Sequence, residues 1–355
     1  MIEIEDYHSR NRKKTIWIVV LVTITAIISL YSICVTQYSI SFGRAIEIVL
    51  NRINGVTPVD YWDRLEDFIV CDSLAPRAVG GVLVGAILGI SGTLMQSTIR
   101  NPLADPYTTG ISSGALLGVT LYTVLGFSII STGDSDIGLV TSAFIFALIP
   151  CAIVVAISSF KKVTSTTIVL IGIAIMFVFN AFSTLIRYTA TDDDVAAIYA
   201  WSVGLLGRLT WESTSYLIIV FILLFVVSLY MAKTLNVLTM DDKMCTALGV
   251  NAQKTRLITM IVVALSTATA VCFVGTIGFV GLIAPHLGRI FVGSENKYLI
   301  PASASIGAFI LIAADSAARV ITATGLPVGV ITSAIGGPLF LLILIRQRKS
   351  AWGNN

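Results

Sequence analysis

The sequence predicts an all-α fold, a polytopic helical membrane protein with about ten transmembrane helices. Hydrophobic residues make up 56% of the 355 residues and charged residues only 12%, against about 25% charged residues in a soluble domain. The mean hydropathy is +0.90. Apolar runs such as Ser215–Ala232 are unbroken, whereas the strands of a membrane barrel alternate apolar and polar residues. These observations exclude a soluble protein and a barrel.

A helix that crosses the hydrocarbon core needs about 20 apolar residues. The first such segment follows Arg10, Arg12, Lys13 and Lys14. It is longer than the apolar part of a cleaved signal peptide and no small-x-small cleavage site follows it, so we expect it to be retained. Between 278 and 320 the pattern leaves the span boundaries open. The ten predicted spans are 16–36, 76–97, 108–128, 138–160, 165–188, 214–233, 256–274, 278–293, 300–320 and 327–345.

The distribution of lysine and arginine predicts the orientation, because cytoplasmic loops are enriched in both. With a cytoplasmic N-terminus and ten alternating spans, most of the 23 basic residues lie inside. We therefore expect a multi-pass protein of the cell membrane with both termini in the cytoplasm. Residues 1–355 are predicted to form a single transmembrane domain. Its two long loops are 37–75 outside, with an amphipathic segment around Ile46, Val49, Leu50 and Ile53, and 234–255 inside.

The chain lacks the motifs of an enzyme. It has neither Gly-x-x-x-x-Gly-Lys-[Ser/Thr], which would bind nucleotide phosphates, nor His-Glu-x-x-His, which would bind zinc. The two histidines, His8 and His286, and the five scattered cysteines form no ligand pattern. We expect no catalytic residue, no cofactor and no metal. The net charge of +3 is too small to indicate a nucleic-acid partner.

Ion-coupled transporters place ionisable residues within the membrane, and here only Asp315, among the acidic residues, lies well inside a predicted span. Arg319 is four residues further along the same helix face and can pair with Asp315 locally, or it can act at the outer surface. An autonomous secondary transporter is therefore a remote alternative. If the chain transports a solute, the energy is expected to come from another subunit.

Glycines repeat along one face of the second span, at Gly81, Gly85, Gly89 and Gly92. A helix face without side chains lets neighbouring backbones approach closely. The pattern predicts that this span lies in the middle of the bundle.

Two short turns are expected at inner helix ends. In the first, 100–106, Pro102 and Pro106 lie four residues apart and end the second span. This segment, with Asn101-Pro102-Leu103 at its start, is either a simple turn or part of a gate. In the second, 161–165, Thr164 or Ser165 can cap the following helix.

The inner loop carries a short amphipathic helix. Met240, Met244, Ala247 and Leu248 share one face, and Gly249 ends the helix. Such a helix either lies on lipid or fits a groove in a partner.

Taken together, these stretches resemble the FecCD family of ABC importer permeases. The matching residues follow one another from 75 to 340, nearly the whole chain, which makes the resemblance far more specific than any single motif. They are Ala75-Pro76-Arg77, Gly89-Ile90-Ser91-Gly92 with Gln96, Asn101-Pro102-Leu103-Ala104-Asp105-Pro106, Gly110-Ile111-Ser112-Ser113-Gly114-Ala115, Trp201-Ser202-Val203-Gly204, Ala247-Leu248-Gly249, Gly275 through Arg289, Asp315 with Arg319, Pro327-Val328-Gly329, and Gly336 through Phe340.

The resemblance implies a type II ABC importer permease fold with ten spans. It also implies the partners: a second permease subunit in a homodimer or heterodimer, two ABC ATPase subunits inside, an extracytoplasmic substrate-binding protein outside, and the lipid bilayer. The substrates it implies are mostly ferric siderophores, with haem, cobalamin or molybdate as alternatives.

The resemblance also implies residue roles. Asn101, Pro102 and Leu103 match an inner gate beside the translocation path, and Thr164 and Ser165 match a second gate turn. Met244, Ala247, Leu248 and Gly249 match the helices that couple to the ATPase. Arg77 and Arg319 match outer arginines that dock the binding protein; the family often has a further arginine where this chain has Leu74.

Overall fold

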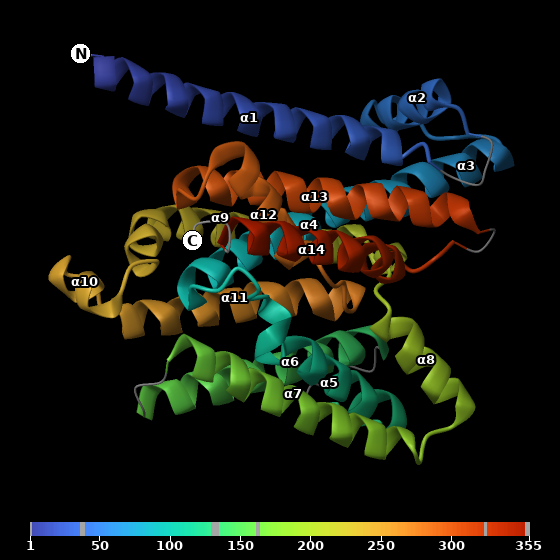
Figure 1. The fold of residues 1–355 in the computed structure, drawn as a ribbon. Coiled ribbons are helices and arrows are strands. Elements are labelled where there is room, and N and C mark those ends of the chain that lie inside the picture. Colours follow the sequence, from blue (N-terminus) through green and yellow to red (C-terminus); the bar gives the residue numbers. More distant parts are fainter. Residues whose placement is uncertain (1, 36–39, 129–134, 161–163, 323–324, 352–355) are drawn as a thin grey trace.

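The computed structural model describes residues 2–35, 40–128, 135–160, 164–322 and 325–351, and every regular element in that part of the chain is a helix (Figure 1). The predicted all-α fold is confirmed. The helices are α1 Ile2–Ser32, α2 Phe42–Ile53, α3 Tyr61–Asp67, α4 Ala75–Ile99, α5 Ile111–Leu125, α6 Ser135–Phe160, α7 Ser165–Arg187, α8 Asp192–Ser202, α9 Trp211–Leu238, α10 Asp242–Ala247, α11 Ala252–Val274, α12 Val280–Val292, α13 Asn296–Ile321 and α14 Val328–Ala351, with short π or 3-10 turns at Phe68–Leu74, Pro106–Thr109 and Leu206–Arg208.

Each of the ten predicted spans overlaps one helix. Within the described residues, seven helices are long and apolar enough to cross a membrane: α1, α4, α6, α7, α9, α11 and α13. The apolar parts of α5, α12 and α14 are shorter. The sequence therefore locates these ten helices, but it predicts α5 and α12 to be longer than they are.

Two of the short helices follow irregular backbone that is packed inside the protein. Residues 104–110 precede α5 and residues 275–279 precede α12. The two segments meet where the backbone N–H of Ile277 donates to the hydroxyl of Tyr107, at 3.2 Å. Irregular backbone is tolerated at membrane depth only where protein or a water-filled cavity satisfies its polar groups, and this contact is one such partner.

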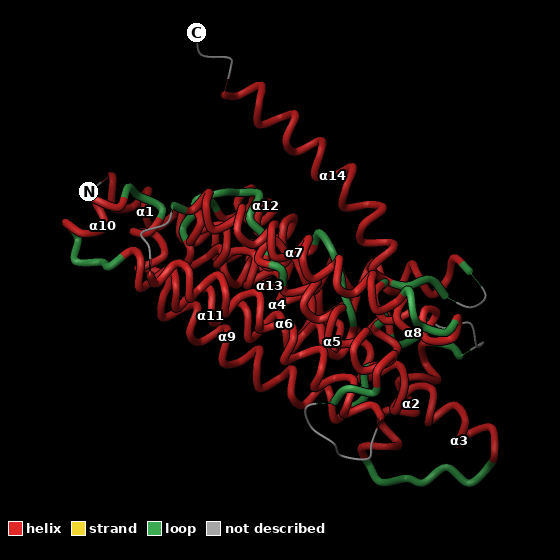
Figure 2. Tube along the Cα trace, turned by 90° about the horizontal axis from the view of Figure 1, so that it is seen from below, coloured by secondary structure: helices red, strands yellow, loops and turns green. Residues whose placement is uncertain are grey.

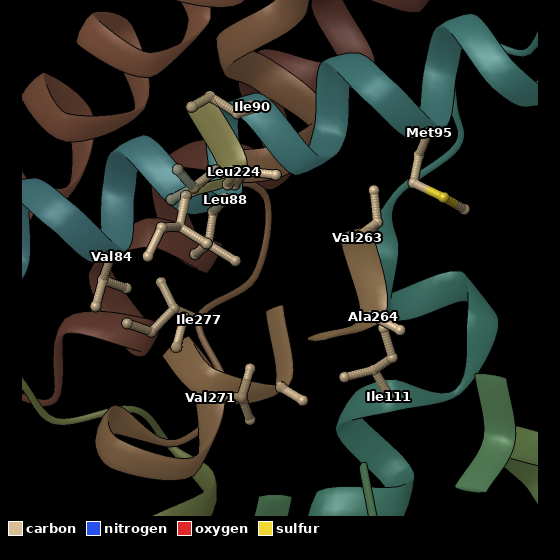
Figure 3. Packing of buried hydrophobic residues seen from close by; sticks show 14 of the residues in the cluster. Val84, Leu88, Ile90, Met95, Ile111, Leu224, Val263, Ala264, Val271 and Ile277 are labelled. Carbon is tan, nitrogen blue, oxygen red and sulfur yellow. The ribbon is translucent and has the colours of Figure 1, made fainter. Parts of the chain in front are cut away.

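The centre of the bundle is α4, as the glycine pattern predicts. A methyl group added at Gly85 would overlap the backbone of Gly307 in α13, and one added at Gly92 would overlap the carbonyl oxygen of Gly281 in α12. Figure 3 shows the core around this helix, where side chains of α4 face residues of α9 and α11, among them Val84, Leu88, Leu224, Val263 and Val271. The glycines of α4 thus let the backbones of α12 and α13 approach it closely.

The bundle has two ends (Figures 1 and 2). The start of α1 and helix α10 lie at one end, here called the α10 end, and α2, α3 and α8 lie at the other, here called the α2 end. The amphipathic segment predicted in loop 37–75 is α2. Its Ala45 and Ile48 pack against Val70 and Cys71, whereas Ile46, Leu50 and Ile53 stay exposed.

Candidate functional site

The turn after α4 lies at the α10 end and is held by its own side chains. The Asn101 side-chain oxygen accepts a hydrogen bond from the Leu103 backbone N–H at 2.9 Å. Pro102 and Leu103 are exposed. Two residues later, Asp105 is buried and accepts a hydrogen bond from the Tyr107 N–H at 3.0 Å. The predicted turn is thus an ordered, side-chain-capped structure that presents Leu103 at the surface.

Thr164 caps helix α7. Its hydroxyl oxygen accepts a hydrogen bond from the Thr167 N–H at 3.2 Å, so the capping expected from the sequence is confirmed for this residue. Its side chain is exposed. Residues 161–163 and the side chain of Ser165 lie outside the described part of the structure.

Helix α10 exposes its apolar side chains. Met244 and Leu248 are more than half exposed, and Ala247 is exposed as well. Gly249 ends the helix in the left-handed region (φ 76°), with N–H to carbonyl bonds from Gly249 to Thr246 and from Val250 to Cys245, the pattern of a Schellman motif. The helix is shorter than the sequence predicts, because Met240 belongs to the preceding turn.

Charged groups join α10 to the bundle. The carboxylate of Asp242 receives the guanidinium groups of Arg100, at the end of α4, and Arg256, in α11. The hydrogen bond from Arg256 and the weaker one from Arg100 hold the pKa of Asp242 below its usual value. The carboxylate is therefore ionised at neutral pH, and the turn at Asn101 and helix α10 share one charged cluster.

At the α2 end, two arginines bind one carboxylate. Asp315 is fully buried in α13, and Arg319 pairs with it one turn away at 3.1 Å, as the spacing predicts. Arg77, from α4, also binds it, with Nη2 to Oδ1 at 2.7 Å and Nε within 3.1 Å of both oxygens. The guanidinium of Arg319 further donates to the backbone oxygen of Val35 at 2.8 Å. The sequence could not reveal the Arg77 contact, because its two partners are 238 positions apart.

A cavity of about 580 Å³ opens beside α5, α7 and α14. None of its lining residues is charged, and most are small or polar. The sequence does not predict that these residues line a cavity, although several of them belong to the stretches that resemble the FecCD family. The lining consists of Tyr107, Ser112, Ser113, Leu116, Met176, Asn180, Ser202, Val203, Thr276, Gly278, Gly329, Val330 and Ser333.

The structure therefore sorts the predicted residues into two groups. The turn at Asn101 and the exposed face of α10 lie together at the α10 end, whereas Arg77 and Arg319 lie together at the α2 end. Among the described residues, no group of three histidine, cysteine, aspartate or glutamate side chains could hold a metal ion.

Known proteins resemble the chain over nearly its whole length. The model of the FecCD transport family matches residues 24–346. A protein of Methanocaldococcus jannaschii named as an ABC transporter permease is 35% identical over 97% of this chain and 98% of its own. The hemin transport system permease protein HmuU of Yersinia pestis is 36% identical over 78% of this chain and 83% of its own.

A solved structure described as a metal-chelate type ABC transporter, in an inward-facing conformation, covers 93% of this chain and 98% of its own, with a TM-score of 0.80 and 29% identity. Other relatives are named as permeases for iron(3+)-hydroxamate, cobalamin and molybdate. The glycine-lined α4 and these likenesses agree, and the chain belongs to the FecCD transport family of ABC transporter permeases.

Proposed function

We propose that this chain is the transmembrane permease subunit of an ATP-driven importer for metal chelates, with ferric siderophores as the substrate. Haem, cobalamin and molybdate are the alternatives, since relatives are named for these solutes. The chain has no nucleotide-binding motif of its own, so separate ATPase subunits hydrolyse the ATP. Residues 1–355 act as a single permease domain, with the N- and C-termini in the cytoplasm.

The observation that carries this proposal is the uncharged cavity. A path for a large chelate must bind it weakly enough to release it, and fixed charges would hold a charged or polar solute too long. Hydroxyl and amide side chains, such as those of Ser113 and Asn180, offer hydrogen bonds without fixed charge. Specificity then resides in the binding protein, and the work comes from ATP.

Helix α14 supports pairing with a second permease subunit. Its later half stands away from the bundle (Figure 2), and Ile335, Leu341 and Ile345 are more than half exposed. The start of the same helix lines the cavity through Gly329, Val330 and Ser333. A second copy placed against α14 would cover apolar surface and enclose the cavity between the two subunits.

The residues at the α10 end are proposed to contact the ATPase and to close the translocation path. The exposed face of Met244, Ala247 and Leu248, with Gly249 at its end, is proposed to dock in a groove of the ATPase. The turn Asn101-Pro102-Leu103 and the turn at Thr164 and Ser165 are proposed to close the path at this end.

The outer role of Arg77 and Arg319 stays a prediction. Both guanidinium groups bind Asp315 and are mostly buried, so a docking contact would use the part of each that remains exposed. If they contact the binding protein, Arg77→Lys and Arg319→Lys should weaken its affinity, because lysine cannot form the bidentate contact. Unchanged affinity in both variants would remove this role.

Purification tests the proposed assembly. The tagged chain, extracted in mild detergent, should retain an ABC ATPase and a second permease subunit, and in vesicles it should move substrate only when the ATPase and ATP are present. Uphill transport by the chain alone would establish a secondary transporter instead.

Competition identifies the substrate. Vesicles that contain the complete importer are loaded with ATP and offered an iron-55 hydroxamate siderophore, with haem, cyanocobalamin or molybdate as competitor. Siderophore uptake that resists the other three solutes supports the proposal. If uptake of the siderophore is absent and another solute is taken up, that solute replaces it.

A further inference from the structure

One carboxylate at the α10 end joins several helices. Arg100 ends α4, and its Nη2 lies 2.5 Å from Oδ1 of Asp242 in α10. Arg256, from α11, binds the same carboxylate through both terminal nitrogens, at 2.6 and 3.1 Å. The Nε of Arg100 also donates to the backbone oxygen of Leu238, at the end of α9, at 2.7 Å. The side chains of Asp242 and Arg100 thus link four helices.

The backbone of Arg100 is held in an unfavourable conformation. Its φ of 55° and ψ of 36° are left-handed, and among the described residues Phe279 is the other non-glycine residue with positive φ. Such a conformation costs an L-amino acid free energy, and both the side-chain contacts of Arg100 and the backbone hydrogen bond from its N–H to the Gln96 oxygen hold the residue in it. The turn begins at the next residue, where the Asn101 N–H donates to the Gln96 oxygen. The position of Arg100 therefore sets where the turn starts.

Helix α10 depends on these contacts for its place. It has six residues, too few to be stable alone. One neutral anchor is Cys245, which is buried, with its thiol against the backbone oxygen of Val237 at 3.2 Å. The guanidinium of Arg100 covers the same thiol at 3.8 Å. Helix α10 is therefore held to the bundle by the Cys245 thiol and by the two guanidinium groups that bind Asp242.

We propose that Asp242 is a positioning residue with two branches: its pair with Arg256 seats α10 on α11, and its pair with Arg100 transmits displacement of α10 to the Asn101–Leu103 turn. This inference rests on the proposed function, in which α10 receives the ATPase and the turn closes the path. Neither Asp242 nor Arg100 then needs to touch the ATPase or the substrate.

A spin label on the turn tests the Arg100 branch. Leu103, 41% exposed, is replaced in a Leu103→Cys chain and labelled in the nanodisc complex with its co-purifying ATPase. The label's mobility is recorded before and after addition of Mg-ATP and vanadate. In the parent complex we expect nucleotide to change the mobility. With Arg100→Gln, ATPase retention and ATP hydrolysis should persist, whereas the change in mobility should fall about fivefold or more, the size of a typical allosteric coupling.

Further variants separate the branches and provide controls. Arg100→Lys retains the cation and should restore most of the response. Asp242→Glu keeps both ion pairs through a side chain one methylene longer, so it should fold and give an intermediate response even if Arg100→Gln does not fold. Arg256→Gln should instead reduce ATPase retention. The matched control is Asp241→Asn, at the position before Asp242. The Asp241 carboxylate accepts a hydrogen bond from the Lys243 N–H, which an asparagine side-chain oxygen can also accept. We therefore expect the response of the parent complex.

The outcomes distinguish this inference from the proposed function. If the parent complex retains no ATPase, the proposed function is wrong, and the inference with it. If the ATPase is retained but the label in the parent never responds to nucleotide, the turn does not move and the inference is overturned. If the parent responds and Arg100→Gln responds equally, the proposed function stands and the transmitting role of the pair is overturned.

Discussion

Single residues at the two ends of the bundle are shared by several partners. The carboxylate of Asp315 is fully buried and binds the guanidinium groups of Arg77 and Arg319. Burying charges is costly, and the cost is offset only where each charge has a partner. From the sequence, Asp315 could be expected only to pair with Arg319 in its own helix. In the structure it also binds Arg77 and therefore joins α4 to α13.

Asp315→Asn should destabilise the protein severely, by about 3–5 kcal/mol, because it leaves two mostly buried cations without a carboxylate. The loss is measured as a lower thermal midpoint of the detergent-solubilised chain. The control is Asp72→Asn, which removes a partly exposed ion pair with Arg52 and should cost less than about 1 kcal/mol. An equal decrease in thermal midpoint in the two variants would show that the buried Asp315 ion pairs stabilise the protein no more than an exposed ion pair does.

At the scale of elements, helix α4 packs closely because its glycines have no side chains. The backbones of α12 and α13 occupy the space that side chains of α4 would fill if these positions were not glycine. The sequence indicated this close packing through spacing alone, but it could not name the opposing residues, Gly281, Ser303 and Gly307, because they come from distant parts of the chain.

Gly92→Ala should therefore displace α4 or α12 and cost about 1–3 kcal/mol or more, as overpacking of a core does. The thermal midpoint and the yield of folded protein measure the effect. Gly43→Ala, in α2, is the matched control, because an added methyl there meets no atom within 4 Å. Alanine should be neutral or slightly stabilising at that position, and a comparable loss at both glycines would contradict the packing argument.

Helix α10 is the element on which the coupling hypothesis depends. The double variant Ala247→Asp with Leu248→Glu should abolish uptake, and the ATPase should be lost from the complex or hydrolyse ATP without transport, because charge replaces the apolar face. The fold should survive, since both side chains are exposed. The matched control Lys243→Gln changes an exposed residue of the same helix outside that apolar face and should transport normally. Normal transport by the double variant would reject the coupling role.

At the scale of the whole molecule, the two ends of the bundle carry different elements. Basic residues such as Arg100 and Arg256 lie at the α10 end together with the exposed α10 face, whereas α2, α3 and α8 occupy the other end (Figure 1). The bias of lysine and arginine predicts that the α10 end faces the cytoplasm.

Impermeant maleimide applied to intact cells tests this orientation. Val59→Cys, at a position 83% exposed at the α2 end, should be labelled, whereas Met240→Cys, 47% exposed beside α10, should react only after the cells are opened. Labelling is compared with the unsubstituted chain, whose five cysteines set the background. The reverse pattern would invert the topology and place the coupling face outside.

The sequence by itself determined the fold class, the positions of ten hydrophobic segments, the central place of α4 and the family, because these depend on composition, on local spacing and on motifs read in order. It also indicated a possible Asp315–Arg319 pair and a helix cap at Thr164 or Ser165, because in each case the partner is within a turn. Only the tertiary structure decided that Arg77 shares Asp315, that Asp242 bridges Arg100 and Arg256, and that an uncharged cavity lies beside α14. Those arrangements join residues far apart along the chain, and the packing of helices, which local spacing does not encode, brings them together.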